Sequence, residues 1–251
     1  MKKIIYILPA TLLVISAAAL LYSFTIGRNT SGQKNNKASG FAVVELFTSE
    51  GCSSCPPADE AVARLLSKNL DNVYILSFHV DYWNRMGWTD PFSEAQFSER
   101  QQKYATTLAV KDIYTPQVIV NGATEFVGSD ETKLNQVIEG NLHNTASDLV
   151  IETKRTGNSV AVNYQTSAQG ALLNLALVQP EATTEVKRGE NSGRTLHHVN
   201  IVRVLQTTNA REKGNLTIEI PQALAGLPLE VVAFTQSKKT LKILGAAQQK
   251  I

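Results

Sequence analysis

Apolar and polar residues follow a regular pattern in the part of the chain after residue 40. Residues 41–47 form a mostly apolar run that ends in the polar residues 48–51, which is typical of a buried parallel strand leading into a loop. Over residues 56–68 apolar side chains recur at helical spacing, and two prolines occupy the first turn. Residues 73–80 are a second apolar run. The order strand, helix, strand predicts a parallel pair of strands with a right-handed crossover.

An insertion follows the second strand. Residues 81–111 contain an aromatic loop with Trp83 and Trp88, and then a helical pattern over residues 93–108. Large aromatic side chains are more often core residues than ligand contacts, so we expect this loop to cover the core rather than to form the wall of a substrate site.

The next segment predicts a hairpin and a helix. Residues 117–120 and 124–127 are strand-like runs on either side of an Asn-Gly pair, which is the sequence of a tight turn. Ser129 or Asp130 can cap a final helix. The pattern therefore predicts an α/β domain over residues 41–146, made of βαβ, an inserted helix and ββα.

The pattern changes from residue 147 onward. About seven short alternating runs are separated by turns rich in Gly, Asn and Pro, which predicts an all-β antiparallel sandwich over residues 147–251. The runs cover residues 149–154, 160–165, 172–178, 198–205, 216–220, 229–234 and 241–244. The chain is thus expected to contain two domains behind an N-terminal segment.

The first residues have the character of an export signal. Lys2 and Lys3 precede an apolar run over residues 4–26, which is longer than the core of a cleaved signal peptide and long enough to span a bilayer. We interpret residues 1–27 as a signal anchor or signal peptide, and residues 28–40, rich in Asn, Ser, Gly and Lys, as a flexible tether. The body is then expected outside the cytoplasm, either membrane-anchored or, after cleavage, periplasmic or secreted.

Charge and composition narrow the range of partners. The 251 residues have a net charge of +2, and 24 basic side chains are scattered among 22 acidic ones. Binding along the phosphates of a nucleic acid needs basic residues gathered in a stripe, so nucleic acid is not an expected partner. The hydrophobic content of 43% is sufficient for ordinary domain cores.

The two cysteines of the chain, Cys52 and Cys55, lie where the first strand gives way to a helix. A disulfide that closes so short a loop constrains the unfolded chain little, so stability alone does not explain the pair. At a helix N-terminus, free backbone N–H groups and the helix dipole favour a thiolate. We therefore interpret Cys52 as a nucleophile that forms a mixed disulfide, and Cys55 as the thiol that resolves it.

This interpretation predicts a thiol-disulfide oxidoreductase that uses no cofactor. Its partners would be protein thiols or disulfides, a redox partner that recycles the pair, and the membrane through the N-terminal segment. Ser53 and Ser54 leave the direction of electron transfer open. Glu45, in the strand before the cysteines, is a candidate proton acceptor for Cys55, since a buried carboxylate takes up a proton more readily than one in water. The alternative is a solvated or strand-end glutamate.

Several segments carry a family resemblance. They are GCSSCPPAD at residues 51–59, HVDYW at 79–83, GWTDPF at 87–92, YTPQ at 114–117 and RGENSGRTL at 188–196. Together they resemble the bacterial secreted family called domain of unknown function 1223. That family is similar to thioredoxins in fold and its activity is unassigned, so the resemblance implies a thioredoxin-like domain with a redox centre, without indicating a substrate.

The resemblance also implies a role for Thr115 and Pro116. Pro116 opens the run at residues 117–120, at the position where a thioredoxin-like fold has a cis proline beside the cysteines. The backbone of Thr115 would then be exposed to pair with a substrate chain. An ordinary trans proline at the start of a strand is the alternative.

Two other functions are compatible with the sequence. His79 ends the second strand, and two thiolates with an imidazole can hold Cu(I), as in the Sco-like copper chaperones, whose cysteine spacing is wider. Cys52, Cys55 and His79 are the residues of this alternative copper site. In the third interpretation the cysteine pair has no function, and the sandwich is a binding or scaffold module.

Two further features lie in the second half. Residues 188–194 are polar and contain glycine, which predicts a loop that either touches the redox centre or merely turns the chain. His197 and His198 are adjacent in a predicted strand, so their side chains are expected on opposite faces and cannot easily share one metal ion.

Overall fold

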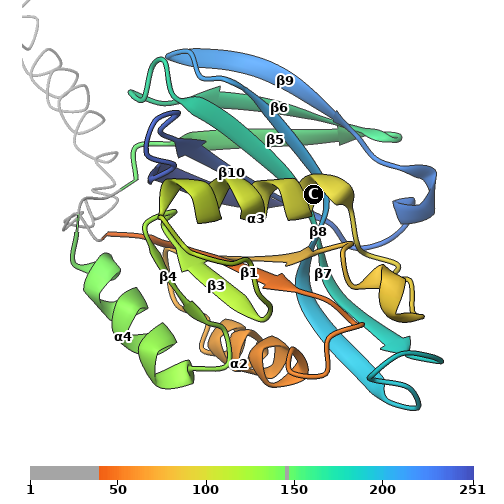
Figure 1. Cartoon of the computed structure of the whole chain (residues 1–251). Helices are drawn as coiled ribbons and strands as arrows, with labels where there is room; N and C mark the ends of the chain where they lie inside the picture. The colour runs from red at the N-terminus through yellow and green to blue at the C-terminus, as the bar shows by residue number, and fades with distance from the viewer. Residues whose placement is uncertain (1–39, 145–146) are drawn as a thin grey trace, which may run out of the picture. The chain divides into compact units, whose positions relative to one another are not determined.

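Two β-sheets and three α-helices make up the described part of the chain, which in this computed structural model comprises residues 40–144 and 147–251 (Figure 1). The predicted anchor or signal peptide over residues 1–27 lies outside the described residues, as does nearly all of the predicted tether. The predicted boundary between the two domains lies between residues 146 and 147, and residues 145–146 also lie outside the described part. No helix among the described residues is long and apolar enough to cross a membrane.

The first half has its elements in the predicted order and close to the predicted bounds. They are β1 (Ala42–Thr48), α2 (Pro56–Ser67), β2 (Val73–His79), the 3-10 helix η1 (Asn84–Met86), α3 (Ala95–Thr107), β3 (Gln117–Val120), β4 (Thr124–Val127) and α4 (Glu131–Leu142). β1 and β2 are parallel, and β3 pairs antiparallel with both β1 and β4. Of the two predicted caps, Asp130 caps α4, because its side chain accepts the backbone N–H of Lys133.

β1 is buried along its whole length, because helices pack against both faces of the sheet around it. Val44 and Leu46 belong to the core formed with α2 and α4, whereas Val43 and Phe47 belong to the core formed with α3. This is the alternation of side chains along a strand. Burial on both faces explains why the sequence of β1 is a nearly continuous apolar run.

The second half contributes strands to both sheets. Its elements are β5 (Val150–Thr156), β6 (Ser159–Gln165), β7 (Leu172–Glu185), β8 (Thr195–Asn209), β9 (Lys213–Glu219), the 3-10 helix η2 (Gln222–Leu224), β10 (Glu230–Gln236) and β11 (Ile243–Lys250). The large sheet has the order β11-β10-β7-β8-β2-β1-β3-β4, and the small sheet has the order β5-β6-β9. β8 joins the two halves, because it runs parallel to β2 with Ile201 opposite Ser77.

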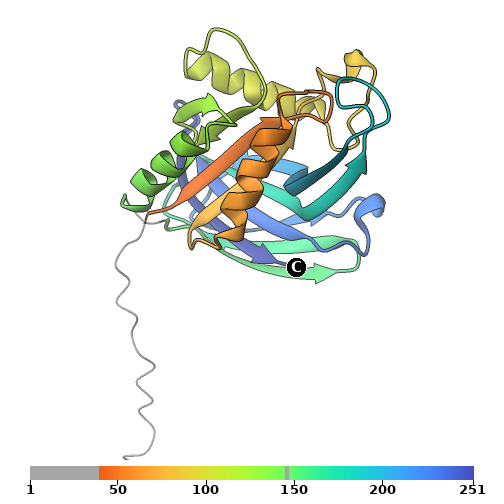
Figure 2. The same ribbon diagram turned by 90° about the horizontal axis from the view of Figure 1, so that it is seen from below.

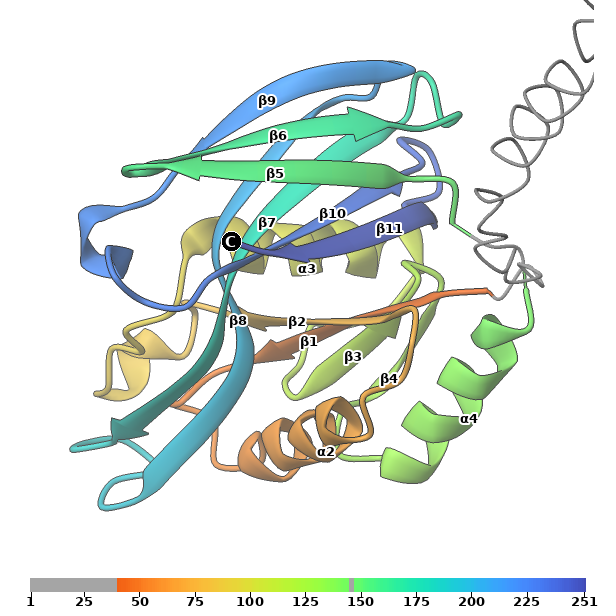
Figure 3. The ribbon, with the colours of Figure 1, turned by 180° about the vertical axis from the view of Figure 1, so that it is seen from behind.

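α3 covers one face of the large sheet, and its core takes residues from both halves, for example Phe78 of β2 and Phe234 of β10. On the other face α2 and α4 cover the β1 and β3 end, while the small sheet covers β7 and β10 (Figure 3). The view from below shows α2, in orange, lying along β1 (Figure 2). The cysteine segment between β1 and α2 therefore lies on the α2 side of the large sheet.

The predicted sandwich is present in part. Two antiparallel layers do pack face to face in the second half, around a core that includes Val162, Leu175 and Ile218. However, β7, β8, β10 and β11 continue the sheet of the first half, so these strands do not form a sandwich apart from it. The physical reason is that β2 would otherwise expose an unpaired strand edge, which β8 covers.

Candidate redox centre

The cysteine pair lies between β1 and the first residue of α2. Cys52 and Cys55 are joined by a disulfide with a Cα–Cα distance of 5.4 Å, and α2 begins at Pro56. Cys55 is the N-cap residue of this helix and no side chain caps it, so the positive end of the helix dipole lies at the pair. Both cysteines are 0% exposed, whereas Ser53 and Ser54 between them are exposed.

Thr115 lies beside the pair, and its bond to Pro116 is cis. The Ser54 hydroxyl lies 3.3 Å from Cys52 Sγ and donates to the Thr115 carbonyl oxygen at 3.4 Å. Trp83 donates its indole N–H to the Thr115 hydroxyl at 2.8 Å. The structure therefore brings Thr115 next to the cysteine segment, as the sequence analysis expected.

The loop between β7 and β8, residues 186–194, covers the cysteine segment. Asn191 of this β7–β8 loop is 0% exposed, and its amide donates to the carbonyl oxygen of Cys52 at 2.9 Å. The Glu190 carboxylate accepts the backbone N–H of Ser53 at 3.1 Å, and this hydrogen bond lowers the pKa of Glu190. Of the two interpretations of this loop, the structure therefore supports contact with the cysteine segment.

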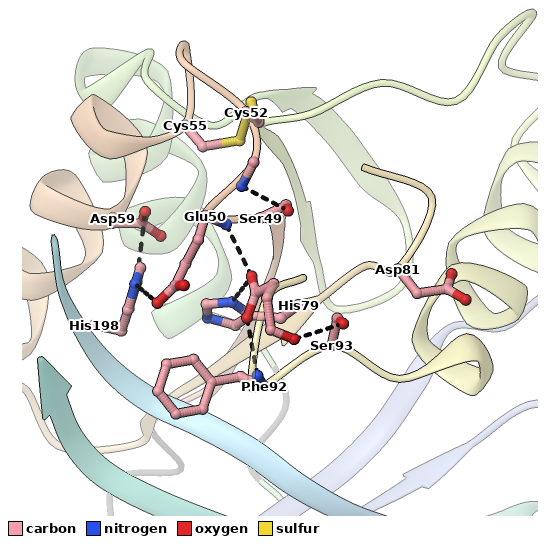
Figure 4. Close-up of polar contacts among 12 residues, drawn as sticks. Ser49, Glu50, Cys52, Cys55, Asp59, His79, Asp81, Phe92, Ser93 and His198 are labelled. Carbon is pink, nitrogen blue, oxygen red and sulfur yellow. Dashed lines mark hydrogen bonds and ion pairs between the residues drawn. A yellow bond between two sulfur atoms is a disulfide. The ribbon is translucent and has the colours of Figure 1, made fainter. Parts of the chain in front are cut away.

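Three buried residues form an acid–histidine cluster below the disulfide: Glu50, Asp59 and His198 (Figure 4). Glu50 precedes the cysteines, Asp59 lies in the first turn of α2, and His198 lies on β8. His198 Nε2 is 3.2 Å from Glu50 Oε1, and His198 Nδ1 is 3.7 Å from Asp59 Oδ2. Burial alone would lower the pKa of His198, but its contacts with Asp59 and Glu50 raise it to about 10. His198 is therefore an imidazolium at neutral pH.

A second histidine, His79, lies beside this cluster. His79 Nδ1 is 2.7 Å from Asp90 Oδ2, and both side chains are fully buried. Asp90 also accepts the backbone N–H groups of Glu50 at 2.8 Å and Phe92 at 2.9 Å. Burial alone would raise the pKa of Asp90, but the attraction of His79 and these hydrogen bonds lower it. The rings of His79 and His198 meet edge to face with 4.7 Å between centroids, so the two groups are continuous.

Both tryptophans of the aromatic loop contact the site. The indole N–H of Trp88 donates to Glu50 Oε2 at 2.7 Å, while Trp83 reaches Thr115 and also packs against the core on the α3 side. Gly189 of the β7–β8 loop lies against Trp88 with a φ of +75°, and a Cβ there would come within 3.2 Å of Trp88 Cβ. The aromatic loop thus covers the core, as predicted, and in addition contacts Glu50 and Thr115 beside the cysteine pair.

The structure does not bring Glu45 to Cys55. Glu45 is fully buried, but it faces α3, on the side of the sheet opposite to α2. Its carboxylate forms an ion pair with Arg100 at 2.6 Å and accepts the Tyr104 hydroxyl at 2.5 Å. Burial alone would lower the pKa of Arg100, and attraction to Glu45 raises it. Glu45 is thus the partner of a buried guanidinium, and it is not placed to take a proton from Cys55.

The geometry gives no support to the copper site of Cys52, Cys55 and His79. Within residues 40–144 and 147–251, no three His, Cys, Asp or Glu side chains are arranged to hold a metal ion. The sulfur atoms are bonded to each other, and His79 Nδ1 faces Asp90. His197 is exposed and His198 buried, which agrees with the expected alternation of adjacent strand residues.

Sequence reasoning missed several of these polar residues. Asp59 follows Cys55 by one helical turn. Residues four apart on a helix are neighbours, so this spacing could have predicted that Asp59 lies near Cys55. The contacts of Asn191 and His198 carried no such signal. Asn191 and Cys52 are 139 residues apart in the sequence, and the pairing of β8 with β2 brings them together.

Comparison with known proteins gives a family and two structural relatives. Residues 43–236 match the model of a family described as "Protein of unknown function (DUF1223)". The crystal structure of protein AGR_C_4864 from Agrobacterium tumefaciens is 30% identical with a TM-score of 0.63, over 82% of this chain and 92% of that one. HBP35 of Porphyromonas gingivalis is 16% identical with a TM-score of 0.59, over 85% of this chain and 76% of that one, which shows a likeness of fold alone. No curated protein matches the chain.

Proposed function

Since the chain belongs to the DUF1223 family, whose function is unknown, we propose from its own site that it catalyses thiol-disulfide exchange through Cys52 and Cys55. The observation that carries this proposal is the disulfide that joins the two cysteines at the N-terminus of α2. When this bond is reduced, the helix N-terminus favours a thiolate at the pair, and a thiolate is the nucleophile of disulfide exchange.

Cys52 is the proposed nucleophile because its sulfur lies against the exposed Ser54 hydroxyl, whereas Cys55 caps the helix. Its thiolate attacks one sulfur of a substrate disulfide, and the other substrate sulfur leaves as a thiolate and takes up a proton. Cys55 loses its proton and attacks Cys52 Sγ, which breaks the mixed disulfide and releases the second substrate thiol. The substrate disulfide is then reduced and the protein dithiol oxidised, and the reverse sequence oxidises a substrate dithiol.

The proposed arrangement is thioredoxin-like over β1 to α4, supported by the order of elements and the place of Thr115 beside the pair. The substrates would be protein thiols or disulfides, whose extended chain pairs with the backbone of Thr115. A second redox protein would recycle the pair. The proposed location is extracytoplasmic, anchored by or released from residues 1–27, for which the apolar run at residues 4–26 is the support.

Trapping of mixed disulfides tests this function. In Cys55→Ala the mixed disulfide cannot be resolved, so we expect client proteins to remain attached to Cys52 in cells of the native host. The adducts should appear on non-reducing gels and disappear after treatment with dithiothreitol. Cys52→Ala is the matched control, because it keeps one cysteine but removes the nucleophile, and it should trap little. A binding or scaffold role predicts no adduct with either variant, and that result would refute the proposal.

A further inference from the structure

Two carboxylates of the acid–histidine cluster lie close to the cysteine pair. Asp59 follows Cys55 by one turn of α2, where side chains four residues apart have Cβ atoms about 5–6 Å from each other. The backbone N–H of Asp59 donates to the Cys55 carbonyl oxygen at 3.2 Å. Glu50 precedes Cys52 by two residues, and Asn191 binds the carbonyl oxygens of both Glu50 and Cys52 at 2.9 Å. Figure 4 shows both carboxylates on the side of His198 that faces the disulfide.

Several other acidic and basic groups lie around the acid–histidine cluster. Asp90 adds a third buried carboxylate next to His79. The buried or half-buried basic groups are His198, His79 and Arg203, whose guanidinium lies 5.1 Å from the centroid of the Phe92 ring. At the surface, Glu190 accepts the backbone N–H of Ser53 at 3.1 Å, and Arg194 donates to Asn191 Oδ1 at 3.0 Å. Of these carboxylates, Glu50 and Asp59 are the ones that lie within four residues of a cysteine in the sequence.

We infer that Glu50 and Asp59 oppose a thiolate at the cysteine pair, so that the pair favours its disulfide form and acts as an electron donor that reduces substrate disulfides. This inference rests on the proposed thiol exchange and adds its direction. A disulfide is uncharged, so a neighbouring negative charge raises the free energy of the thiolate without affecting the oxidised form. A strongly oxidising cysteine pair has a stabilised reduced form, whereas these carboxylates destabilise the reduced form. The helix dipole contributes only about half a positive charge at the same place.

His198 is a positioning residue in this arrangement. It holds both carboxylates through ion pairs at 3.2 and 3.7 Å, and its single charge offsets one of them. In the resulting reaction the substrate S–S bond breaks, the Cys52–Cys55 bond forms, and the two thiol protons pass to the substrate sulfurs. A dithiol donor of lower reduction potential regenerates the reduced pair.

The test is the pH dependence of alkylation by iodoacetamide of the reduced, otherwise native chain. We expect the first thiol to react to have a pKa at or above about 8.5, the value of free cysteine. Asp59→Asn should lower the pKa of that thiol by about one or more, since it removes a full charge one helical turn from Cys55. Glu60→Gln is the matched control, because this next residue of α2 makes the same charge change with a side chain that is 69% exposed. Glu60→Gln should change the pKa of the thiol by no more than about 0.3.

A second readout is the equilibrium of the pair with glutathione at pH 9. Asp59→Asn should shift it toward the reduced form by up to about tenfold, which corresponds to about 30 mV for a two-electron couple. A merely structural cluster would lower the melting temperature of the variant and leave the thiol pKa and this equilibrium unchanged.

The inference is overturned if Asp59→Asn changes the thiol pKa no more than Glu60→Gln does. It is also overturned if the first thiol of the wild-type chain titrates below about pH 7, well under free cysteine. If Asp59→Asn does not fold, Glu50→Gln decides by the same criteria. Trapping by Cys55→Ala is a separate measurement. If adducts form but Asp59→Asn leaves the thiol pKa unchanged, the pair exchanges thiols without control by the carboxylates. If no adducts form, the proposed function itself fails.

Discussion

At the scale of single residues, Arg100 shows how a charge is held inside the molecule. Its guanidinium pairs with the fully buried Glu45, donates to the Tyr104 hydroxyl at 3.0 Å, and lies over the rings of Phe78 and Phe234. Removal of one partner of a buried ion pair leaves the other charge without compensation, which costs far more than the loss of a surface pair. Arg100 and Glu45 therefore fix α3 on the sheet.

Arg100→Gln should lower the free energy of unfolding by about 3–5 kcal/mol, because it leaves the Glu45 carboxylate buried without a counter-charge. The measurement is urea denaturation followed by circular dichroism. Arg64→Gln is the matched control, since Arg64 pairs with Glu131 at 2.9 Å on the surface with a side chain that is 52% exposed. That change should cost less than about 1 kcal/mol. Equal losses in the two variants would show that the Arg100 pair is as weak as the surface pair.

The residues of the site were predictable only where a local pattern marked them. Cys52 and Cys55 stood out by their spacing before a helix, and the resemblance placed Thr115 beside them. Of the two interpretations of Glu45 the structure shows the buried one, but the sequence does not say which face of the sheet Glu45 occupies or that Arg100 is opposite. His198 carried no signal because its partners, Glu50 and Asp59, come from elements far away in the chain.

At the scale of elements, the β7–β8 loop packs over the cysteine segment. Asn191 is buried and donates two hydrogen bonds to the backbone of the cysteine segment, while Ser53 donates to Glu190. Both sulfur-bearing residues are 0% exposed. We therefore expect a thiol to reach the disulfide faster when the contacts of Asn191 are lost.

Asn191→Ala should accelerate reduction of the disulfide by dithiothreitol about tenfold, because the loss of two hydrogen bonds at about 0.5–1.5 kcal/mol each favours the open loop. The measurement is the rate of thiol release under pseudo-first-order conditions. Ser192→Ala is the control, since this neighbouring residue is exposed and its hydroxyl bonds only within the loop, to the Lys187 carbonyl oxygen. An unchanged rate in Asn191→Ala would mean that the loop does not limit access.

Elements were easier to predict than their assembly. The apolar runs and helical spacing gave β1, α2, β2 and α3 within a few residues, because these elements are marked by burial patterns of their own sequence. Both long strands extend past their predicted runs. β7 continues to residue 185, and β8 already begins at residue 195. Their outer parts carry polar side chains on the exposed positions, so hydrophobicity alone does not show that the strands continue toward the redox centre.

At the scale of the whole molecule, the two halves share one sheet and one core. Phe78 of the first half packs in the same core as Val202 and Phe234 of the second. No pattern within either half predicts this, because each half taken alone is a plausible domain and the parallel pair of β2 and β8 joins segments that are distant in sequence. The shared core has a measurable consequence for unfolding.

Unfolding should occur as one transition for residues 40–251, because neither half can lose its structure without exposing the core of the other. Both tryptophans lie in the aromatic loop of the first half, so tryptophan fluorescence reports on that half. Far-ultraviolet circular dichroism reports on all strands. The two signals should give the same midpoint in urea. Separate midpoints would show that the halves unfold independently.

β8 also limits how this chain can change in length. Its side chains alternate between exposed His197 and buried His198, and the same strand continues to Thr207, which donates to Asn174 at 2.7 Å. A single inserted residue between these positions would turn His197 inward and remove the imidazolium from the carboxylates, whereas an insertion in the β7–β8 loop leaves the alternation intact. Relatives of this chain are therefore expected to keep the length of β8 between these positions.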